Sequence, residues 1–275
     1  MGTSHRHKAG PIGSPNWGKS SAAVTSIANV EIADEQLQQD PSIVIPQEVV
    51  DRKRAVYTKR INTQYHNAIR YLVRAAGGRT AVSSGRSRAV GGSGVVWAKG
   101  LAHAFYEIAE QGLATWLQNK GIRLGGRHSC REILTVIEEF ITVYFAGMDG
   151  TAASEALEYI MDKVEQKADR DLGKLEEVLK RIISEDEIKD LIDDFFGIYI
   201  YSHLSQNFKE KLEKDKGADI ATKTMEEIKE LILDDVHRGI SGRPASRVDW
   251  RGHEGEQFIT EEFNRIILIL TNNED

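Results

Sequence analysis

Apolar residues recur at steps of three and four positions through most of this 275-residue chain. After Gly121 the spacing appears in a series of segments, which cover residues 133–144, 157–164, 175–182, 188–200, 228–236 and 258–269. Such spacing places the apolar side chains on one face of an α-helix. No segment between them alternates apolar and polar residues as a half-buried strand does. The pattern therefore predicts an all-α fold, a multi-helix, bundle-like domain.

Three short motifs stand directly before apolar runs and have the form Ser/Thr-x-x-Glu. They are Ser129–Glu132, Ser184–Glu187 and Thr224–Glu227. In a capping box the hydroxyl accepts from the backbone N–H three residues on, and the Glu side chain accepts from the backbone N–H of the Ser or Thr. The motifs predict three helix starts.

Composition divides the chain into three regions. Residues 1–50 hold four of the five prolines and many small polar residues, so we expect an extended, flexible N-terminal arm and linker. Residues 51–106 form a basic helical segment with a Gly/Ser/Arg-rich loop at 77–94, and from Arg52 to Tyr106 there are eleven Lys and Arg but no Asp or Glu. Residues 107–275, with 22 basic and 36 acidic residues, are predicted to form an acidic all-helical domain.

The overall composition limits the class of protein. With 40% hydrophobic and 28% charged residues, the chain resembles ordinary soluble globular proteins. Its single cysteine, Cys130, excludes an internal disulfide framework and suits a reducing compartment. No apolar stretch has the length of a membrane span. We expect a cytoplasmic protein that does not contact a membrane.

The run GSPNWGKS near the N-terminus fits the phosphate-binding pattern G-x-x-x-x-G-K-[ST] at every fixed position. That loop needs a buried strand before it, and Met1–Ile12 contains no apolar run. Pro15 lacks an amide hydrogen, and Trp17 puts a bulky ring where the backbone would approach a phosphate. We interpret the match as a coincidence, and keep a hydrolase that uses Lys19 and Ser20 only as a minor hypothesis.

Other candidates for catalysis or metal binding are explained by helix surfaces or by the core. Adjacent carboxylates point about 100° apart on a helix, and we interpret four such pairs as solvated faces: Glu138/Glu139, Asp193/Asp194, Glu226/Glu227 and Asp234/Asp235. Asp234 and His237 have the spacing of a metal-binding half-motif, but a second half is missing from the sequence. Cys130, close to His128, is interpreted as a plain buried thiol. We predict a non-enzymatic protein without metal or cofactor.

The basic segment is the stronger physical signal for a binding function. Its candidate contact residues are Arg70, Arg74, Arg79, Arg86 and Arg88. Interleaved aromatic residues, Tyr57, Tyr65, Tyr71 and Trp97, would allow phosphates to be neutralised while bases stack. Equally, the segment would dock onto acidic helices of the same chain or of a partner protein, because charge asymmetry predicts an acidic partner without identifying it.

The N-terminus, MGTSHRHKAGPIGSPNWG, resembles that of QatB proteins, components of the bacterial anti-phage system called Qat. These proteins begin Met-Gly-Thr-Ser and continue through Gly-Pro-x-Gly and a proline to a tryptophan. The corresponding residues here are Met1, Gly2, Thr3, Ser4, Gly10, Pro11, Gly13, Pro15 and Trp17. An Arg/Gly/Ser-rich segment before a helical body is also similar, whereas PNWGKSS stands where many relatives have a Leu-Val-Pro-Pro-Trp-like run.

The resemblance implies a defence component that acts with a QueC-like enzyme (QatC type), an ATPase and a TatD-like nuclease. It implies that Gly2 receives a 7-deazaguanine-type modification, and that Thr3, Ser4, Gly10, Pro11, Gly13, Pro15 and Trp17 are recognised by the QueC-like enzyme. A glycine amine suits such a reaction, because it is unhindered and α-amines titrate at about pH 8. From the residues alone, a frayed terminus explains the same stretch. A nucleic-acid-binding module that uses residues 52–99 remains the alternative function.

Overall fold

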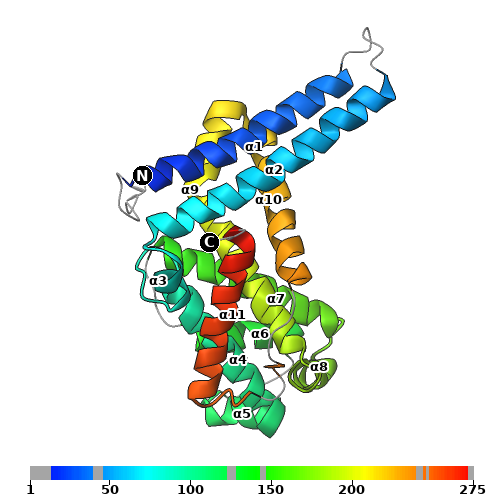
Figure 1. Cartoon of the computed structure of the whole chain (residues 1–275). Coiled ribbons are helices and arrows are strands. Elements are labelled where there is room, and N and C mark those ends of the chain that lie inside the picture. The colour runs from blue at the N-terminus through cyan, green and yellow to red at the C-terminus, as the bar shows by residue number, and fades with distance from the viewer. Residues whose placement is uncertain are drawn as a thin grey trace, which may run out of the picture.

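The computed structural model describes residues 14–39, 46–122, 128–142, 147–239, 244–245 and 248–271, without the side chains of residues 38 and 39. These residues form eleven α-helices and no strand (Figure 1). The prediction of an all-α fold is confirmed. The helices are α1 (Pro15–Gln39), α2 (Gln47–Ala75), α3 (Arg79–Ser83), α4 (Gly92–Gln111), α5 (Leu113–Asn119), α6 (Cys130–Ile141), α7 (Met148–Lys167), α8 (Leu172–Ser184), α9 (Glu187–Lys216), α10 (Ala218–Arg238) and α11 (His253–Thr271).

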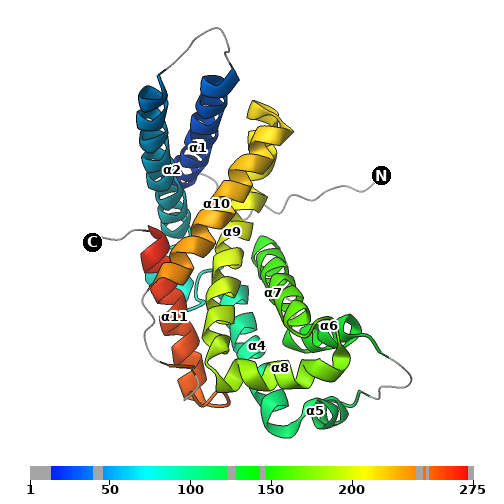
Figure 2. The same cartoon turned by 90° about the vertical axis from the view of Figure 1, so that its right-hand side faces the viewer.

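Helices α1 and α2 form a long antiparallel hairpin. They lie side by side in both views, and the end at which the chain passes from α1 to α2 projects away from α3 to α8 (Figures 1 and 2). The other end of the hairpin belongs to the main core. There α1 buries Val24 and Ile27, and α2 buries Ile69 and Leu72. The hairpin is therefore anchored in the main core at one end, and α10 also contacts the outer half of α1.

Helix α9 is the central element of the body. It contacts α7 on one side and α10 and α11 on the other (Figure 2). Its middle is apolar around most of the circumference, and a helix of this kind is stable only when neighbours cover it on several sides. Phe196 of α9 stacks on Phe263 of α11 with ring centroids 4.1 Å apart. This packing explains why thirty residues from Glu187 to Lys216 form one uninterrupted helix.

The structure differs from the sequence expectation for residues 15–39, which form α1 and not part of an arm. The buried face of α1 is built largely from small side chains such as Ala23 and Ala28, both in the core, so its apolar spacing is inconspicuous. Pro15 is the first residue of the helix, where a missing N–H costs nothing and the fixed φ suits a helix. Residues 1–13 of the expected arm lie outside the described residues.

Only one of the three predicted capping boxes exists. The Ser129 hydroxyl accepts from the Glu132 N–H at 3.2 Å, and the Glu132 carboxylate accepts from the Ser129 N–H at 2.8 Å. By contrast, Ser184 ends α8, and Thr224 lies inside α10. The motif is short enough to occur by chance within helices, and the predictions at Ser184 and Thr224 are wrong.

Candidate functional site

The start of α1 is fixed against two other helices. The ring of Trp17 packs against that of Phe208 in α9, with centroids 5.5 Å apart. The buried Ser20 hydroxyl donates to the Ala68 carbonyl oxygen of α2 at 2.7 Å. The position of the start of α1 relative to α2 and α9 is therefore defined.

The phosphate-loop match falls on this helix start. Residues from Pro15 to Ser20 are helical, so their backbone cannot curve around a phosphate as a Gly-rich loop does. The Lys19 ammonium lies over the ring of Tyr71, 5.4 Å from its centroid. The helical backbone supports the interpretation of the match as a coincidence.

The residues that the resemblance assigns to the modification and to its recognition fall in two groups. Gly2, Thr3, Ser4, Gly10, Pro11 and Gly13 lie outside the described residues. Pro15 begins α1 and is exposed, whereas Trp17 is half-buried by its contact with α9. The structure thus locates the attachment point of the N-terminal segment.

The arginines of the basic segment have different roles. Arg70 is half-buried, and its Nε and Nη2 donate to the carbonyl oxygen of Thr271 at 3.2 and 2.8 Å. A cation at the carbonyl end of a helix is favourable, so Arg70 caps α11. Arg74 is exposed near the end of α2, and Arg79 is half-buried at the start of α3.

The remaining two arginines lie between α3 and α4, and both are exposed. Arg86 donates through Nε to the Ser84 hydroxyl at 2.9 Å. Arg88 is two residues further along the same loop. Elsewhere in the basic segment, Lys99 pairs with Glu256 at 3.7 Å. The chain's own carboxylates therefore neutralise part of this segment.

The aromatic residues of the basic segment are mostly unavailable for stacking on bases. Tyr65 is 1% exposed and Trp97 5%, and Tyr71 is half-buried with its ring beneath Lys19. Tyr57 is half-buried in the exposed part of α2. Tyr65 and Trp97 recur at helical spacing because their side chains face the core. The expectation of base stacking is therefore wrong for these two residues.

The Gly/Ser/Arg-rich segment is anchored to the body by Asp149. Its carboxylate accepts from the backbone N–H groups of Gly91 at 3.2 Å and Ser93 at 2.6 Å, and from the hydroxyl of Tyr199. His203 contributes Nε2 at 3.2 Å. Burial alone would raise the pKa of Asp149, but these hydrogen bonds and the neighbouring His203 lower it to about 2. The start of α4 is thereby capped by a carboxylate from α7.

Two glycines of this segment are required by close packing. Gly91 has φ +114°, and a Cβ on it would lie 2.1 Å from the Val82 carbonyl oxygen. A Cβ on Gly94 would lie 2.8 Å from the ring of Tyr199. The glycines thus permit a tight turn and a close helix contact, whereas composition alone indicated flexibility.

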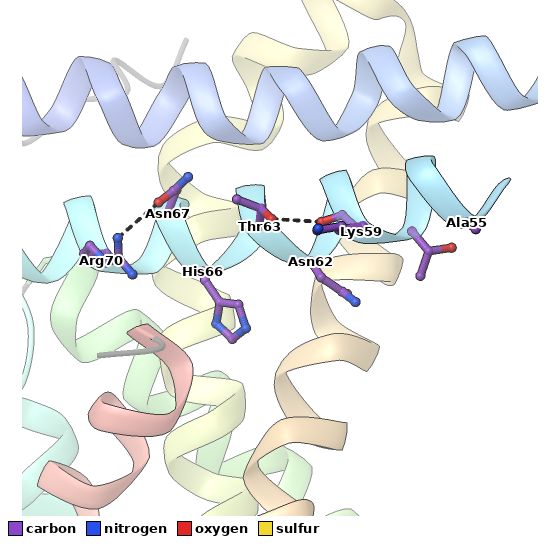
Figure 3. Close-up of a pocket in the computed structure, with 8 residues that line it drawn as sticks. Ala55, Lys59, Asn62, Thr63, His66, Asn67 and Arg70 are labelled. Atoms are coloured by element: carbon purple, nitrogen blue, oxygen red, sulfur yellow. Dashed lines mark hydrogen bonds between the residues drawn. The ribbon is translucent and has the colours of Figure 1, made fainter. Parts of the chain in front are cut away.

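A polar groove runs along one face of α2 (Figure 3). It has a volume of about 610 Å³, and its lining consists of Ala55, Thr58, Lys59, Asn62, Thr63, His66, Asn67 and Arg70. Asn62 and His66 point away from α1. His66 Nδ1 lies 2.9 Å from the Leu270 carbonyl oxygen, and burial lowers its pKa. The groove contains donors but no lining carboxylate.

A buried ion network joins α9 to α11, and it was not predicted. Lys189 Nζ lies 2.6 Å from Asp193 Oδ2 and 3.0 Å from Glu262 Oε1. Arg265 Nη2 lies 2.8 Å from Asp193 Oδ2. Burial and the nearby Glu262 raise the pKa of Asp193 to about 7, as expected when two carboxylates share a buried site.

Asp194 begins a second set of ion pairs that reaches α7 and α10. It pairs with Lys163 and accepts from His237 Nε2 at 2.8 Å. Asp193 and Asp194 are 3% and 1% exposed, so the interpretation of this pair as a solvated face is wrong. Asp193 and Asp194 lie within the mostly apolar run IKDLIDDFFGIYI, and this run could have predicted their burial. A helix that is apolar on all sides is covered by its neighbours, so its charged side chains are buried as well.

The other candidates are accounted for within the fold. Cys130 is buried, and burial raises the pKa of its thiol, so the interpretation as a plain buried thiol is confirmed. Asp234 pairs with Arg238 at 3.2 Å, while His237 contacts Asp194 and not Asp234. Within the described part of the chain, no group of three or more His, Cys, Asp or Glu side chains is arranged to hold a metal ion.

Comparison with known proteins identifies the family. The model of the family described as Qat anti-phage system associated protein QatB matches residues 79–270, from the start of α3 almost to the end of α11. Comparisons with curated proteins and with solved structures give no match. Among the helices described, none is both long and apolar enough to cross a bilayer. Because the match covers more than half of the chain and includes the anchored loop and the central helices, this protein belongs to the QatB family of the Qat anti-phage system.

Proposed function

We propose that this QatB-family chain is a non-enzymatic defence component whose N-terminal Gly2 receives a 7-deazaguanine-type modification from a QueC-like partner enzyme. An ATPase and a TatD-like nuclease of the same system are the further proposed partners. Family membership supports a role in anti-phage defence, and the MGTS start supports the modification. The proposed recognition residues are Thr3, Ser4, Gly10, Pro11, Gly13, Pro15 and Trp17.

The observation that carries this proposal is the fixed start of α1. The contacts of Trp17 with Phe208 and of Ser20 with Ala68 hold the start of the helix in place, so residues 1–13 precede a fixed point on the body. Thirteen residues span at most about 45 Å when extended. A segment of this length would allow Gly2 to enter the active site of another protein while the helical body stays outside.

The experiment is intact mass measurement with sequencing of the N-terminal peptide. The protein is expressed alone and together with its genomic neighbours, and we expect an added mass on Gly2 only in the second sample. Gly2→Leu is the control, because a bulky second residue prevents removal of Met1 and leaves no free amine at position 2. An unmodified Gly2 in both samples would refute the proposal.

A second candidate function is binding of nucleic acid through residues 52–99. The exposure of Arg74, Arg86 and Arg88 supports it, whereas the burial of Tyr65 and Trp97 limits it to phosphate contacts. This function predicts salt-sensitive binding. Changing Arg74, Arg79, Arg86 and Arg88 to Glu together should abolish that binding, and unchanged binding would exclude the function.

A further inference from the structure

A polar cavity lies where the ends of α7 and α10 meet the first half of α9. Its volume is about 510 Å³, which is within the range of small-molecule sites, about 300–1,000 Å³. The wall includes Lys163 of α7, Asp193 and Asp194 of α9, and Gly239 directly after α10. We propose that this cavity binds a small, uncharged molecule that carries an amide group, whose N–H donates to Asp193.

The wall of the cavity contains a buried carboxylate oxygen without a donor. Asp193 is 3% exposed. Its Oδ2 accepts from Lys189 Nζ at 2.6 Å and from Arg265 Nη2 at 2.8 Å. Its Oδ1 has no hydrogen-bond partner in the described part of the chain. Because buried polar atoms are nearly always hydrogen-bonded and an unpaired one costs free energy, Oδ1 indicates a ligand with a donor group.

A buried donor without an acceptor lies beside the same wall. Arg265 Nη1 also has no partner among the described residues. It borders Gly239, since a Cβ on Gly239 would lie 2.5 Å from it. Arg265 and Asp193 already form an ion pair through Nη2 and Oδ2, so the unpaired donor and the unpaired acceptor belong to one pair of side chains. An amide, which has an N–H and a C=O side by side, complements both atoms.

The charges around Asp193 indicate that the donor of the ligand is uncharged. When all groups are ionised, the positive charges of Lys189 and Arg265 balance the negative charges of Asp193 and Glu262, which contact them. A ligand ammonium would add an uncompensated charge to this buried network, and such a charge is costly. A neutral N–H provides the missing hydrogen bond without that penalty.

Two other classes of ligand fit the cavity less well. A phosphate needs an excess of positive charge, but the wall has four carboxylates against three lysines. Two of these lysines already have a carboxylate from α9, since Lys163 pairs with Asp194 and Lys167 with Glu187. A metal ion needs several ligating side chains, and within the described ranges no group of three His, Cys, Asp or Glu is arranged to hold one.

The test uses three compounds that share a six-membered ring. The first, 2-piperidone, is a cyclic amide, N-methyl-2-piperidone lacks its N–H, and piperidine carries a positive charge and no carbonyl group. Binding to the full chain is followed by ¹H–¹⁵N NMR at pH 8, where Asp193 is mostly ionised. We expect 2-piperidone to shift the backbone amide signals of Asp193 and Asp194 in a saturable way. The other two compounds should bind at least about fivefold more weakly, because neither provides both hydrogen bonds.

Two variants test whether the compound binds in this cavity. Asp193→Asn keeps the shape of the side chain, but if its oxygen stays with Lys189 and Arg265, an NH₂ group takes the place of Oδ1. It should remove the preference for 2-piperidone over the N-methyl compound. Gly239→Ala puts a methyl group against Arg265 Nη1 at a φ of −62°, where alanine is unstrained. It should weaken the binding of 2-piperidone at least about fivefold.

Each variant has a matched control. Asp190→Asn changes an exposed carboxylate of the same cavity, and Gly18→Ala adds a methyl group to α1 where a Cβ has no neighbour within 4 Å. Both should bind 2-piperidone within about twofold of the wild type. Folding is checked by circular dichroism and thermal melting. If Asp193→Asn does not fold, Gly239→Ala and the three compounds still test the proposal.

Three outcomes would overturn the proposal. The first is the absence of shifts with 2-piperidone at its highest soluble concentration, since water alone would then satisfy Asp193 Oδ1. The second is equal or tighter binding of piperidine or of the N-methyl compound. The third is equal binding of 2-piperidone by Gly239→Ala and Gly18→Ala, because the compound would then lie elsewhere. None of the cavity residues belongs to the N-terminal segment, so the result is independent of whether Gly2 is modified.

Discussion

At the scale of single residues, the most unusual group outside the ion network is the carboxyl of Glu31. It is 4% exposed. One oxygen accepts from the Thr224 hydroxyl, and the other, Oε1, has no hydrogen-bond partner. Burial raises the pKa of Glu31 from 4.5 to about 7, although the Thr224 hydrogen bond opposes the shift. Below about pH 7 the neutral form of Glu31 is therefore favoured in the folded protein.

This shift predicts how stability depends on pH. Between about pH 4.5 and 7 the folded state binds more protons than the unfolded state at Glu31, so the free energy of unfolding falls as pH rises through this range. Above about pH 7 Glu31 is ionised in both states, and its contribution to the free energy of unfolding no longer changes with pH. We expect Glu31→Gln to remove this part of the pH dependence and to stabilise the protein at pH 8 relative to pH 5.

Urea unfolding at pH 5 and pH 8 measures the effect. Glu35→Gln is the matched control, because Glu35 pairs with Lys223 at 2.8 Å on the surface and is 36% exposed. It should leave the difference between the two pH values in place. A Glu31→Gln protein with the wild-type pH dependence would contradict the assignment.

At the scale of the helices, sequence reasoning succeeded where a helix has one wide apolar face. The helices after Gly121 follow the three- and four-residue spacing because large side chains such as Phe196 and Phe263 must be buried together. It failed for α1, whose buried face is built mainly from small residues, as at Ala23. It also failed at Thr224, since local sequence does not reveal that a hydroxyl inside α10 contacts a carboxyl of α1.

The capping motifs give a prediction about individual helices. Ser129→Ala should lower the free energy of unfolding by about 1 kcal/mol, because the Glu132 N–H loses its acceptor. Ser184→Ala should change it by less than about 0.5 kcal/mol, since Ser184 is exposed and ends α8. Chemical denaturation of both variants checks the pair. Equal losses would show that the sequence motif, and not the cap geometry, determines the effect.

At the scale of the whole molecule, the N-terminal hairpin and the ion network depend on contacts between distant parts of the sequence. The family match begins at residue 79, so α1 and α2 lie before it. The pairing of carboxylates and cations between α9 and α11 is determined only when these helices pack. Asp193 and Asp194 were therefore interpreted from the sequence as surface residues. The sequence predicted an N-terminal arm, but it did not predict that the chain becomes helical at Pro15, because the start of α1 is fixed by contacts with α2 and α9.

The ion network gives a prediction about how the body is held together. Arg265→Met removes a cation that contacts both Asp193 and Glu262, which are 3% and 5% exposed. Lys189 still contacts both carboxylates. Removing one partner of a buried ion pair costs about 3–5 kcal/mol, because the remaining charge stays buried and under-compensated.

Arg238→Met is the control, since Arg238 pairs with Asp234 at 3.2 Å on the surface and such pairs contribute at most about 1 kcal/mol. Urea unfolding at pH 8, where Asp193 is mostly ionised, should show the larger loss in the free energy of unfolding for Arg265→Met. At pH 5 the loss for Arg265→Met should be smaller, because protonation of Asp193 relieves the excess negative charge. Equal small losses in both variants would mean that solvent reaches the network and that α9 and α11 are held by apolar packing alone.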